Sequence, residues 1–441
     1  MNLSDSLVLP PTFSLSSSQI KAKILMYCNI YRVFVACGVL VMPHAMAQSG
    51  FIPSIFLVIF ISLLTTINHN YMDKLASALC LSPGITLETL CGKILGPSMK
   101  KFILLVLSGS QICAFIGSFI LATDLLHHSF CGNEFSHLEC VSRFDIGLFL
   151  AAFNILMVFI PNLKTFGYIS SLSVVFQFFA LLCVFFSAIS TLFSKEDTKS
   201  LLLEETLFTN WSNSPETLGI ILYIFQRITF YLPIKANYSQ VPNFHKYYVK
   251  SMNYTFFYIL LISSPCYFLF FTSGKEIVFQ NFDKSFRTIE VFKLCYIVVI
   301  FLSNPINLFP IYNSIYSIKG FDSYVKSKGD FKAYLLKLLI RLIVSCFGIL
   351  IGITVNSFVK FCSFVGAFFF SFLGLILPGV LLLKFLSAEP ANLDFIGDSS
   401  QKNFISRKTS VVFVVAIGCV IWVSATCNSI RDLIFSDSSA I

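Results

Sequence analysis

Two otherwise apolar stretches of the chain contain residues that could do chemistry, because they interrupt a helix. In the first, the small residues Ala36, Cys37 and Gly38 are followed by Pro43, which lacks a backbone N–H and frees the carbonyl four residues earlier. Amide and carbonyl groups exposed inside an apolar layer persist only where they line a cavity or bind a ligand. This stretch is therefore a predicted binding site.

The second stretch places Gln226, Arg227 and Thr229 in an apolar run that ends near Pro233. A charge at the centre of a membrane span costs at least about 2.5 kcal/mol. Arg227 therefore lines a pathway and attracts an anion, pairs with a partner, or reaches the membrane surface along its own aliphatic stem. The sequence leaves these three interpretations open.

The composition predicts that both stretches lie in a membrane. Of the 441 residues, 56% are hydrophobic and 12% are charged, against about 25% charged in an ordinary soluble domain. A soluble enzyme, a nucleic-acid-binding protein and a disordered scaffold would not have this composition. The apolar runs recur along the whole chain and predict an all-α polytopic membrane protein.

Eleven apolar segments are predicted to cross the bilayer as helices. They are residues 23–46, 53–72, 101–126, 145–161, 166–193, 217–234, 252–272, 289–317, 333–354, 357–384 and 409–427. The first and sixth segments hold the two interruptions, and they run in opposite directions because they are an odd number of crossings apart. Residues 23–193 and 217–384 are thus predicted to be two five-helix repeats of inverted topology, with both interruptions at their interface.

The basic residues set the predicted orientation. More Lys and Arg residues fall in the segments that share a side with the N-terminus than on the other side, which places that end in the cytoplasm. An odd helix count then puts the C-terminus outside, in a plasma membrane or a vacuole- or lysosome-like membrane. The other predicted segments are an N-tail (1–22), an extracytoplasmic loop (194–216), a cytoplasmic loop (385–408), the eleventh helix (409–427) and an extracytoplasmic tail (428–441).

The predicted extracytoplasmic loop at 127–144 contains Cys131 and Cys140 beside three histidines. A disulfide or unpaired thiols are favoured there, and a metal site is the weaker alternative because the spacing matches no strong ligand pattern. The sequon at Asn210 fits the same orientation, since it would be glycosylated only on the outer or lumenal face.

Four motifs resemble the amino acid/auxin permease family of the amino acid-polyamine-organocation superfamily. The run GVLVMPHA at 38–45 followed by QSGF at 48–51 resembles the first-helix signature of that family, and Phe225 with LPI at 232–234 resembles its sixth-helix motif. SNPINLFP at 303–310 is similar to its eighth-helix motif. VGA at 365–367 with LPG at 377–379 resembles its tenth-helix motif, and the four occur in family order.

The resemblance implies a LeuT-like fold, with a five-plus-five inverted repeat and one extra helix. It also implies a secondary active transporter of amino acids, in particular neutral ones, that works by alternating access and is either ion-coupled or facilitative. It implies that the substrate carboxylate binds free amides of the first interruption, that the ammonium meets free carbonyls of both, and that the side chain points toward Phe225 and Ile228. The candidate substrate-binding residues are Ala36, Cys37, Gly38, Val39, Phe225, Gln226, Arg227, Ile228 and Thr229, with Pro43 and Pro233 as helix-break residues. This chain departs from the family at Ala36 and at 226–228, so the substrate side chain stays open.

Coupling to an ion has three candidate residues. No Asp or Glu lies at the middle of a predicted span, and His44 is the best candidate for a proton, with a packed histidine as the alternative. Ser303 and Asn304 could instead supply oxygens to sodium.

Other functions have less support in the sequence. Neither a Walker phosphate loop nor a His-Glu-x-x-His motif is present, so ATP-driven pumping and metalloprotease activity are not predicted. The expected partners are an amino acid, a proton or sodium, and the lipid bilayer, with no cofactor, metal or nucleic acid. A sensor with a transporter fold and a carrier of another small organic solute, which Arg227 favours, are the alternatives.

Overall fold

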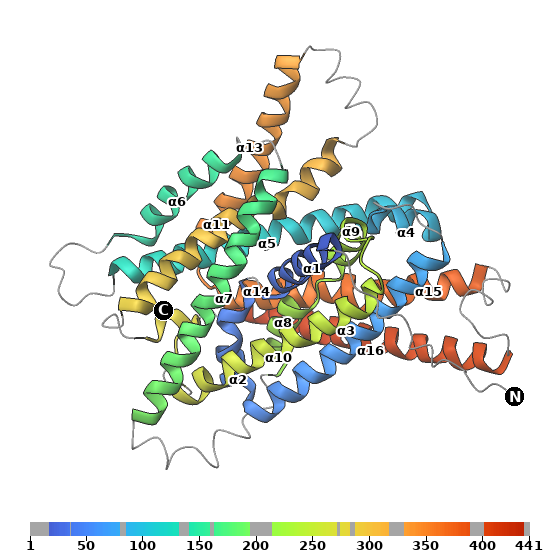
Figure 1. The fold of residues 1–441 in the computed structure, drawn as a ribbon, viewed down its shortest axis with the longest axis horizontal. Coiled ribbons are helices and arrows are strands. Elements are labelled where there is room, and N and C mark those ends of the chain that lie inside the picture. Colours follow the sequence, from blue (N-terminus) through green and yellow to red (C-terminus); the bar gives the residue numbers. More distant parts are fainter. Residues whose placement is uncertain are drawn as a thin grey trace, which may run out of the picture.

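The computed structural model describes ten segments of the chain. These are residues 17–35, 37–79, 85–131, 141–158, 163–194, 214–270, 274–282, 287–316, 330–388 and 401–435. Within them the regular structure is helical throughout, which confirms the predicted all-α class (Figure 1).

The helices of the first part of the chain are α1 (Ser17–Val35), η1 (Gly38–Val41), α2 (Met42–Ser49), α3 (Phe51–Ala78), α4 (Leu87–Leu95), α5 (Pro97–Cys131), α6 (Arg143–Val158) and α7 (Leu163–Ser194). Those of the second part are α8 (Ser214–Phe225), η4 (Ile228–Phe230), α9 (Tyr231–Asn237), α10 (Phe244–Phe270), η5 (Val278–Gln280), α11 (Arg287–Tyr316), α13 (Asp330–Thr354), α14 (Phe358–Val365), η6 (Gly366–Phe370), η7 (Phe372–Ile376), α15 (Leu377–Ala388) and α16 (Gln401–Phe435).

Each of the eleven predicted spans coincides with a helix or with a chain of consecutive helices. Within the described segments, eight helices are long and apolar enough to cross a membrane, and the spans number nine if the bent pair of Gln19–Val35 and Gly38–Ser49 counts as one. The protein is therefore an integral membrane protein. Helices α6 and α11 are outside this set, so the count of eleven and the repeat boundaries stay predictions.

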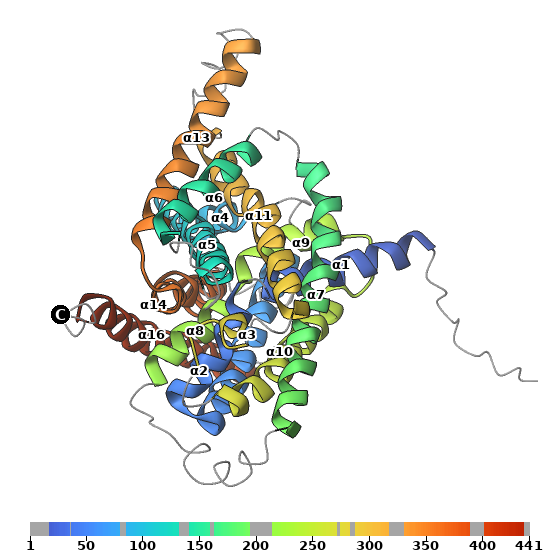
Figure 2. The same cartoon turned by 90° about the vertical axis from the view of Figure 1, so that its left-hand side faces the viewer.

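The two interrupted spans lie side by side and antiparallel in the middle of the bundle. The Thr217 hydroxyl at the start of α8 donates to the Ala45 carbonyl of α2 at 3.0 Å, and farther along both spans a Cβ on Gly38 would lie 2.5 Å from Ile224 Cγ1. About 83% of the apolar window of Ser214–Asn237 is buried within the protein, against 22% for Phe331–Thr354. The broken span through α8 is thus central, whereas α13 extends away from the bundle (Figures 1 and 2).

The chain α14–η6–η7–α15 packs on α8 at very short range. A Cβ on Gly366 would lie only 2.0 Å from the Gly219 carbonyl oxygen, so no larger residue fits between these backbones. Segments η6 and η7 are π-helical turns, which occur often at functional sites and widen a helix locally. This close approach holds residues 366–376 against the second interruption.

The predicted disulfide and the predicted glycosylation sequon lie at or beyond the limits of the described segments. Cys131, the last residue of α5, is disulfide-bonded, whereas Cys140 lies outside the described residues, as does Asn210. Among the described residues, no group of three His, Cys, Asp or Glu side chains could hold a metal ion.

Candidate functional site

The first interruption lies between Gln19–Val35 and Gly38–Ser49, two helical stretches that are bent by 43° relative to each other. Ala36 lies outside the described residues; Cys37, Gly38 and Val39 are buried, and the Cys37 thiol lies 3.4 Å from the Ser118 hydroxyl of α5. The carbonyl of Val39, which Pro43 cannot bond, accepts the N–H of Met42 instead. The break is thus a tight 3₁₀ turn rather than an open loop.

The second interruption is formed by Gln226 and Arg227, between the end of α8 and the start of η4. The N–H of Arg227 donates to the Phe225 carbonyl at 3.1 Å, which ends the α-helical pattern. A helix that restarts at Ile228 leaves its first N–H groups without intrahelical acceptors. These N–H groups carry the partial positive charge of a helix N-terminus.

The two predicted helix-break prolines lie just beyond the breaks, in the half-helices that follow them. Pro43 is in the first turn of α2, and Pro233 is an exposed residue in the first turn of α9. A proline fits there because its missing N–H has no helical partner in a first turn. The prolines start the second half-helices, and the small or polar residues before them form the turns.

Arg227 is the most unusual residue of the site, because it is a charged side chain that is buried. Its side chain is 5% exposed and lies over two aromatic rings, with the guanidinium carbon 5.0 Å from the Tyr223 ring centre and 4.6 Å from that of Phe370. Its Nε has no hydrogen-bond partner, and none of the three ion pairs found among the described residues includes it. Its burial does not fit a side chain that reaches the membrane surface, and its described partners are the two rings, so a role in the pathway stays a prediction.

The other predicted residues of the second break are divided between the site and the core. The Gln226 amide donates to the Thr65 hydroxyl of α3 at 2.6 Å, while its Oε1 is buried without a partner. The Phe225 ring packs on Phe256 of α10 at 4.3 Å, and Ile228 is buried. Thr229 is half-buried.

Two of the predicted coupling residues, His44 and Asn304, have described side chains, and both bond to residues outside the breaks. His44 is half-buried on α2 and contacts Gln48 at 3.2 Å. The Asn304 amide donates to Asn154 of α6 at 3.1 Å, and the side chain of Ser303 lies outside the described part of the structure.

Comparison with known proteins identifies the family. Residues 24–431 match the family described as transmembrane amino acid transporter protein. This chain belongs to that family. Its relatives include "Amino acid transporter AVT3C" of Arabidopsis thaliana, 21% identical over 95% of this chain and 91% of the relative. "Vacuolar amino acid transporter 3" of Saccharomyces cerevisiae is 26% identical over 80% of this chain, and that match spans 49% of the yeast protein.

Among solved structures, a manganese transporter of Eremococcus coleocola, in complex with an aromatic bis-isothiourea substituted compound, is similar to this chain. The two are 14% identical with a TM-score of 0.49, over 98% of this chain and 90% of the other.

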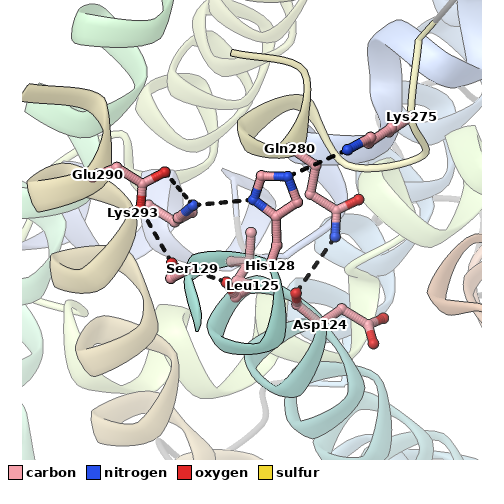
Figure 3. A network of polar contacts seen from close by, with 8 residues as sticks. All are labelled: Asp124, Leu125, His128, Ser129, Lys275, Gln280, Glu290 and Lys293. Carbon is pink, nitrogen blue, oxygen red and sulfur yellow. Dashed lines mark hydrogen bonds and ion pairs between the residues drawn. The ribbon is translucent and has the colours of Figure 1, made fainter. Parts of the chain in front are cut away.

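In this family member, the face opposite the start of α1 is closed over the first break by residues 274–282. Val278 and Phe279 of η5 are buried, and η5 packs on η1 and α5. Figure 3 shows the polar contacts beside residues 274–282. The His128 ring lies between two ammonium groups, with Nε2 3.4 Å from Lys275 Nζ and Nδ1 3.3 Å from Lys293 Nζ. Lys293 also donates to Glu290 at 2.5 Å.

The face where α1 begins is closed by a second polar network, which ties α9 to α3 and α10. The Lys235 ammonium donates to Asp73 at 2.6 Å, and the Tyr231 hydroxyl donates to the same carboxylate at 2.7 Å. Tyr231 also contacts His245 Nδ1 at 2.9 Å, and His245 Nε2 lies 2.5 Å from the Asn70 amide oxygen. Because α9 is the half-helix after the break, these bonds fix its position relative to α3.

Removing both charges of the Asp73–Lys235 pair should destabilise the protein by less than the sum of the two single changes. Both side chains are more than a quarter exposed, so we expect a coupling energy of about 1 kcal/mol or less. The melting temperatures of Asp73→Asn, Lys235→Gln and the double variant in detergent measure it. Strictly additive effects would contradict a direct interaction between the two groups.

The site also contains four residues that no sequence motif indicates as binding residues. Tyr223 and Phe370 hold the Arg227 guanidinium, and Ser118 and Thr65 contact the two breaks. The only sequence signal for Phe370 was its position three residues after the matched VGA motif.

Proposed function

We propose that this protein is a secondary active transporter of neutral amino acids that works by alternating access at the two helix breaks. The observation that carries the proposal is Arg227: a buried guanidinium at a helix break, with Nε unbonded and no carboxylate of the described chain beside it. A cation held over aromatic rings in a low-dielectric site is suited to bind the carboxylate of a solute.

The substrate carboxylate is placed between Arg227 and the N–H groups that begin η1 at Gly38. Gly38 of the first break lies against Tyr223 of α8, whose ring also lies under the Arg227 guanidinium, which supports a site shared by the two breaks. The substrate ammonium then meets backbone carbonyls at the ends of α1 and α8, where the helix dipoles are negative. No buried side chain of the described residues is Asp or Glu, so no fixed anion is available for a basic substrate side chain.

The relatives support an amino acid as the solute and a vacuole-like membrane as one location. Both are named as amino acid transporters, and the yeast protein is named as vacuolar. With the N-terminus in the cytoplasm, residues 274–282 close the extracytoplasmic side and the Asp73–Lys235 network closes the cytoplasmic side. Alternating access would open these two closures in turn.

Proteoliposome counterflow tests this proposal. Vesicles loaded with a mixture of unlabelled neutral amino acids should accumulate a labelled one, and the panel is repeated at two pH values with and without sodium. Binding without exchange would show a sensor instead of a transporter. Inhibition by dicarboxylic acids that lack an amino group, without inhibition by amino acids, would show a carrier of organic acids, the alternative that Arg227 also supports.

A further inference from the structure

His69 of α3 is the one buried residue of the described chain that is suited to carry a proton within the membrane. No Asp or Glu of the described residues is buried, and the buried bases are Arg227, Lys293 and His69. An arginine stays protonated in proteins, and Lys293 is bonded to Glu290. His69 has no solvent-exposed surface, whereas His44, selected from the sequence, is only half-buried.

The hydrogen bonds of His69 fix which ring nitrogen is available. Nδ1 lies 2.7 Å from the Thr65 carbonyl, which can only accept, so Nδ1 carries a hydrogen. Nε2 of the neutral ring then has a lone pair, and it faces the Tyr248 hydroxyl at 3.3 Å. When Nε2 is protonated, its N–H group can donate a hydrogen bond to the Tyr248 oxygen, while Nδ1 keeps its hydrogen bond to the Thr65 carbonyl. Both forms of the ring are therefore accommodated.

A single residue joins His69 to the second break. The Thr65 carbonyl accepts the hydrogen bond of His69 Nδ1, and the Thr65 hydroxyl accepts a hydrogen bond from the Gln226 side-chain amide at 2.6 Å. Gln226 directly precedes Arg227. A positive charge on His69 thus lies one helical turn of α3 away from the break. In a low-dielectric interior such a charge favours an anion bound at the break.

Tyr231 and Tyr248 join His69 to the aqueous face. Their rings pack on His69 with ring centres 5.5 and 5.2 Å away, the Tyr231 pair T-shaped and the Tyr248 pair tilted. Aromatic rings at this distance stabilise a cation. The Tyr231 hydroxyl reaches Asp73 and His245, which are only partly buried. The titratable and charged groups facing His69 are thus these two tyrosines and His245, with Asp73 and its partner Lys235 behind Tyr231.

We propose that His69 binds the proton that couples amino acid transport to a pH gradient, and that His245 and Asp73 are its entry from the face where α1 begins. The proposal rests on the proposed transport function. One proton from hydronium forms an N–H bond at Nε2, water is left behind, and the imidazolium increases the affinity of the break for the substrate carboxylate. By linkage, substrate binding raises the affinity of His69 for the proton by the same factor.

Counterflow of a labelled neutral amino acid at about pH 4.5 and about pH 7.5, a window wide enough to include the protonation of a buried imidazole, tests the proposal. The wild-type protein should bind the amino acid about 5- to 150-fold more tightly at the lower pH, the usual range of coupling between sites. His69→Gln should exchange with the same affinity at both values. His127→Gln, in α5 at the opposite face, is the matched control and should keep the wild-type ratio.

Three outcomes overturn the role of His69. The wild-type affinity could be independent of pH, His69→Gln could keep the wild-type ratio of affinities at the two pH values, or His44→Gln rather than His69→Gln could lose that ratio. If His69→Gln does not fold, Tyr248→Phe decides. Tyr248→Phe removes the oxygen that accepts the hydrogen bond of protonated Nε2, so the midpoint of the pH dependence should move downward. An unmoved midpoint contradicts the proposal. Absence of exchange by the wild-type protein at every pH would overturn the transport function itself, which is a distinguishable result.

Discussion

Replacing Gly38 by valine should abolish amino acid uptake while the protein still inserts into the membrane. A Cβ at this position would lie 2.5 Å from Ile224 Cγ1 and 3.2 Å from Tyr223 Cδ1, so η1 and α8 must separate to admit a larger side chain. The two breaks would then no longer face each other at the distance that one substrate molecule bridges. A displacement of about 1 Å at a functional site costs about a hundredfold in rate, and we expect at least that loss.

The measurement is initial uptake in proteoliposomes, normalised to the amount of protein inserted. Gly38→Ala should show a smaller loss, because only one methyl group must be accommodated. Gly147→Ala is the matched control, since its Cβ would meet Ile353 Cγ1 at 3.2 Å in the packing of α6 on α13, away from the breaks. Uptake at the wild-type rate by Gly38→Val would show that the substrate does not bind between these two segments.

Replacing Arg227 by methionine should weaken amino acid binding strongly without unfolding the protein. Methionine retains much of the contact with Tyr223 and Phe370 but supplies no donor for the substrate carboxylate. A hydrogen bond to a charged group contributes about 1.5–3 kcal/mol, which corresponds to a rise in Kd of about 10- to 150-fold. Because a buried unpaired charge is also removed, the melting temperature in detergent should stay unchanged or increase.

Arg227→Lys separates charge from geometry, since lysine retains the positive charge but not the planar fork of donors. We expect a Kd between those of the wild type and the methionine variant. Arg341→Met is the control, because its guanidinium also lies over a ring, that of Tyr312 at 5.6 Å, on a peripheral helix. Equal losses of affinity in Arg227→Met and Arg341→Met would argue against a specific role for Arg227.

The positions of the breaks could be predicted from the sequence, because apolar spans make any polar or conformationally unusual residue conspicuous. Gln226 and Arg227 stand out in an apolar run, and the structure ends α8 immediately before them. The predicted antiparallel arrangement of the two broken spans is confirmed by the contacts of α2 with α8.

The details that depend on packing could not be predicted. The prolines indicated the neighbourhood of each break, but close contact at Gly38 and the lack of helical bonding at Arg227 set the turns themselves. His69 lies near the predicted end of a span, where a polar residue ordinarily contacts the membrane surface. It is buried only because α9 and α10, which come about 160 to 180 residues later, cover this end of α3.

A structure of the protein with a transported amino acid bound would show directly whether the substrate lies between the two helix breaks. We expect density for the amino acid between η1 and η4, with its carboxylate about 3 Å from the Arg227 guanidinium or from the N–H groups at the start of η1. A substrate bound elsewhere, with Arg227 unchanged between Tyr223 and Phe370, would show that the breaks do not form the binding site.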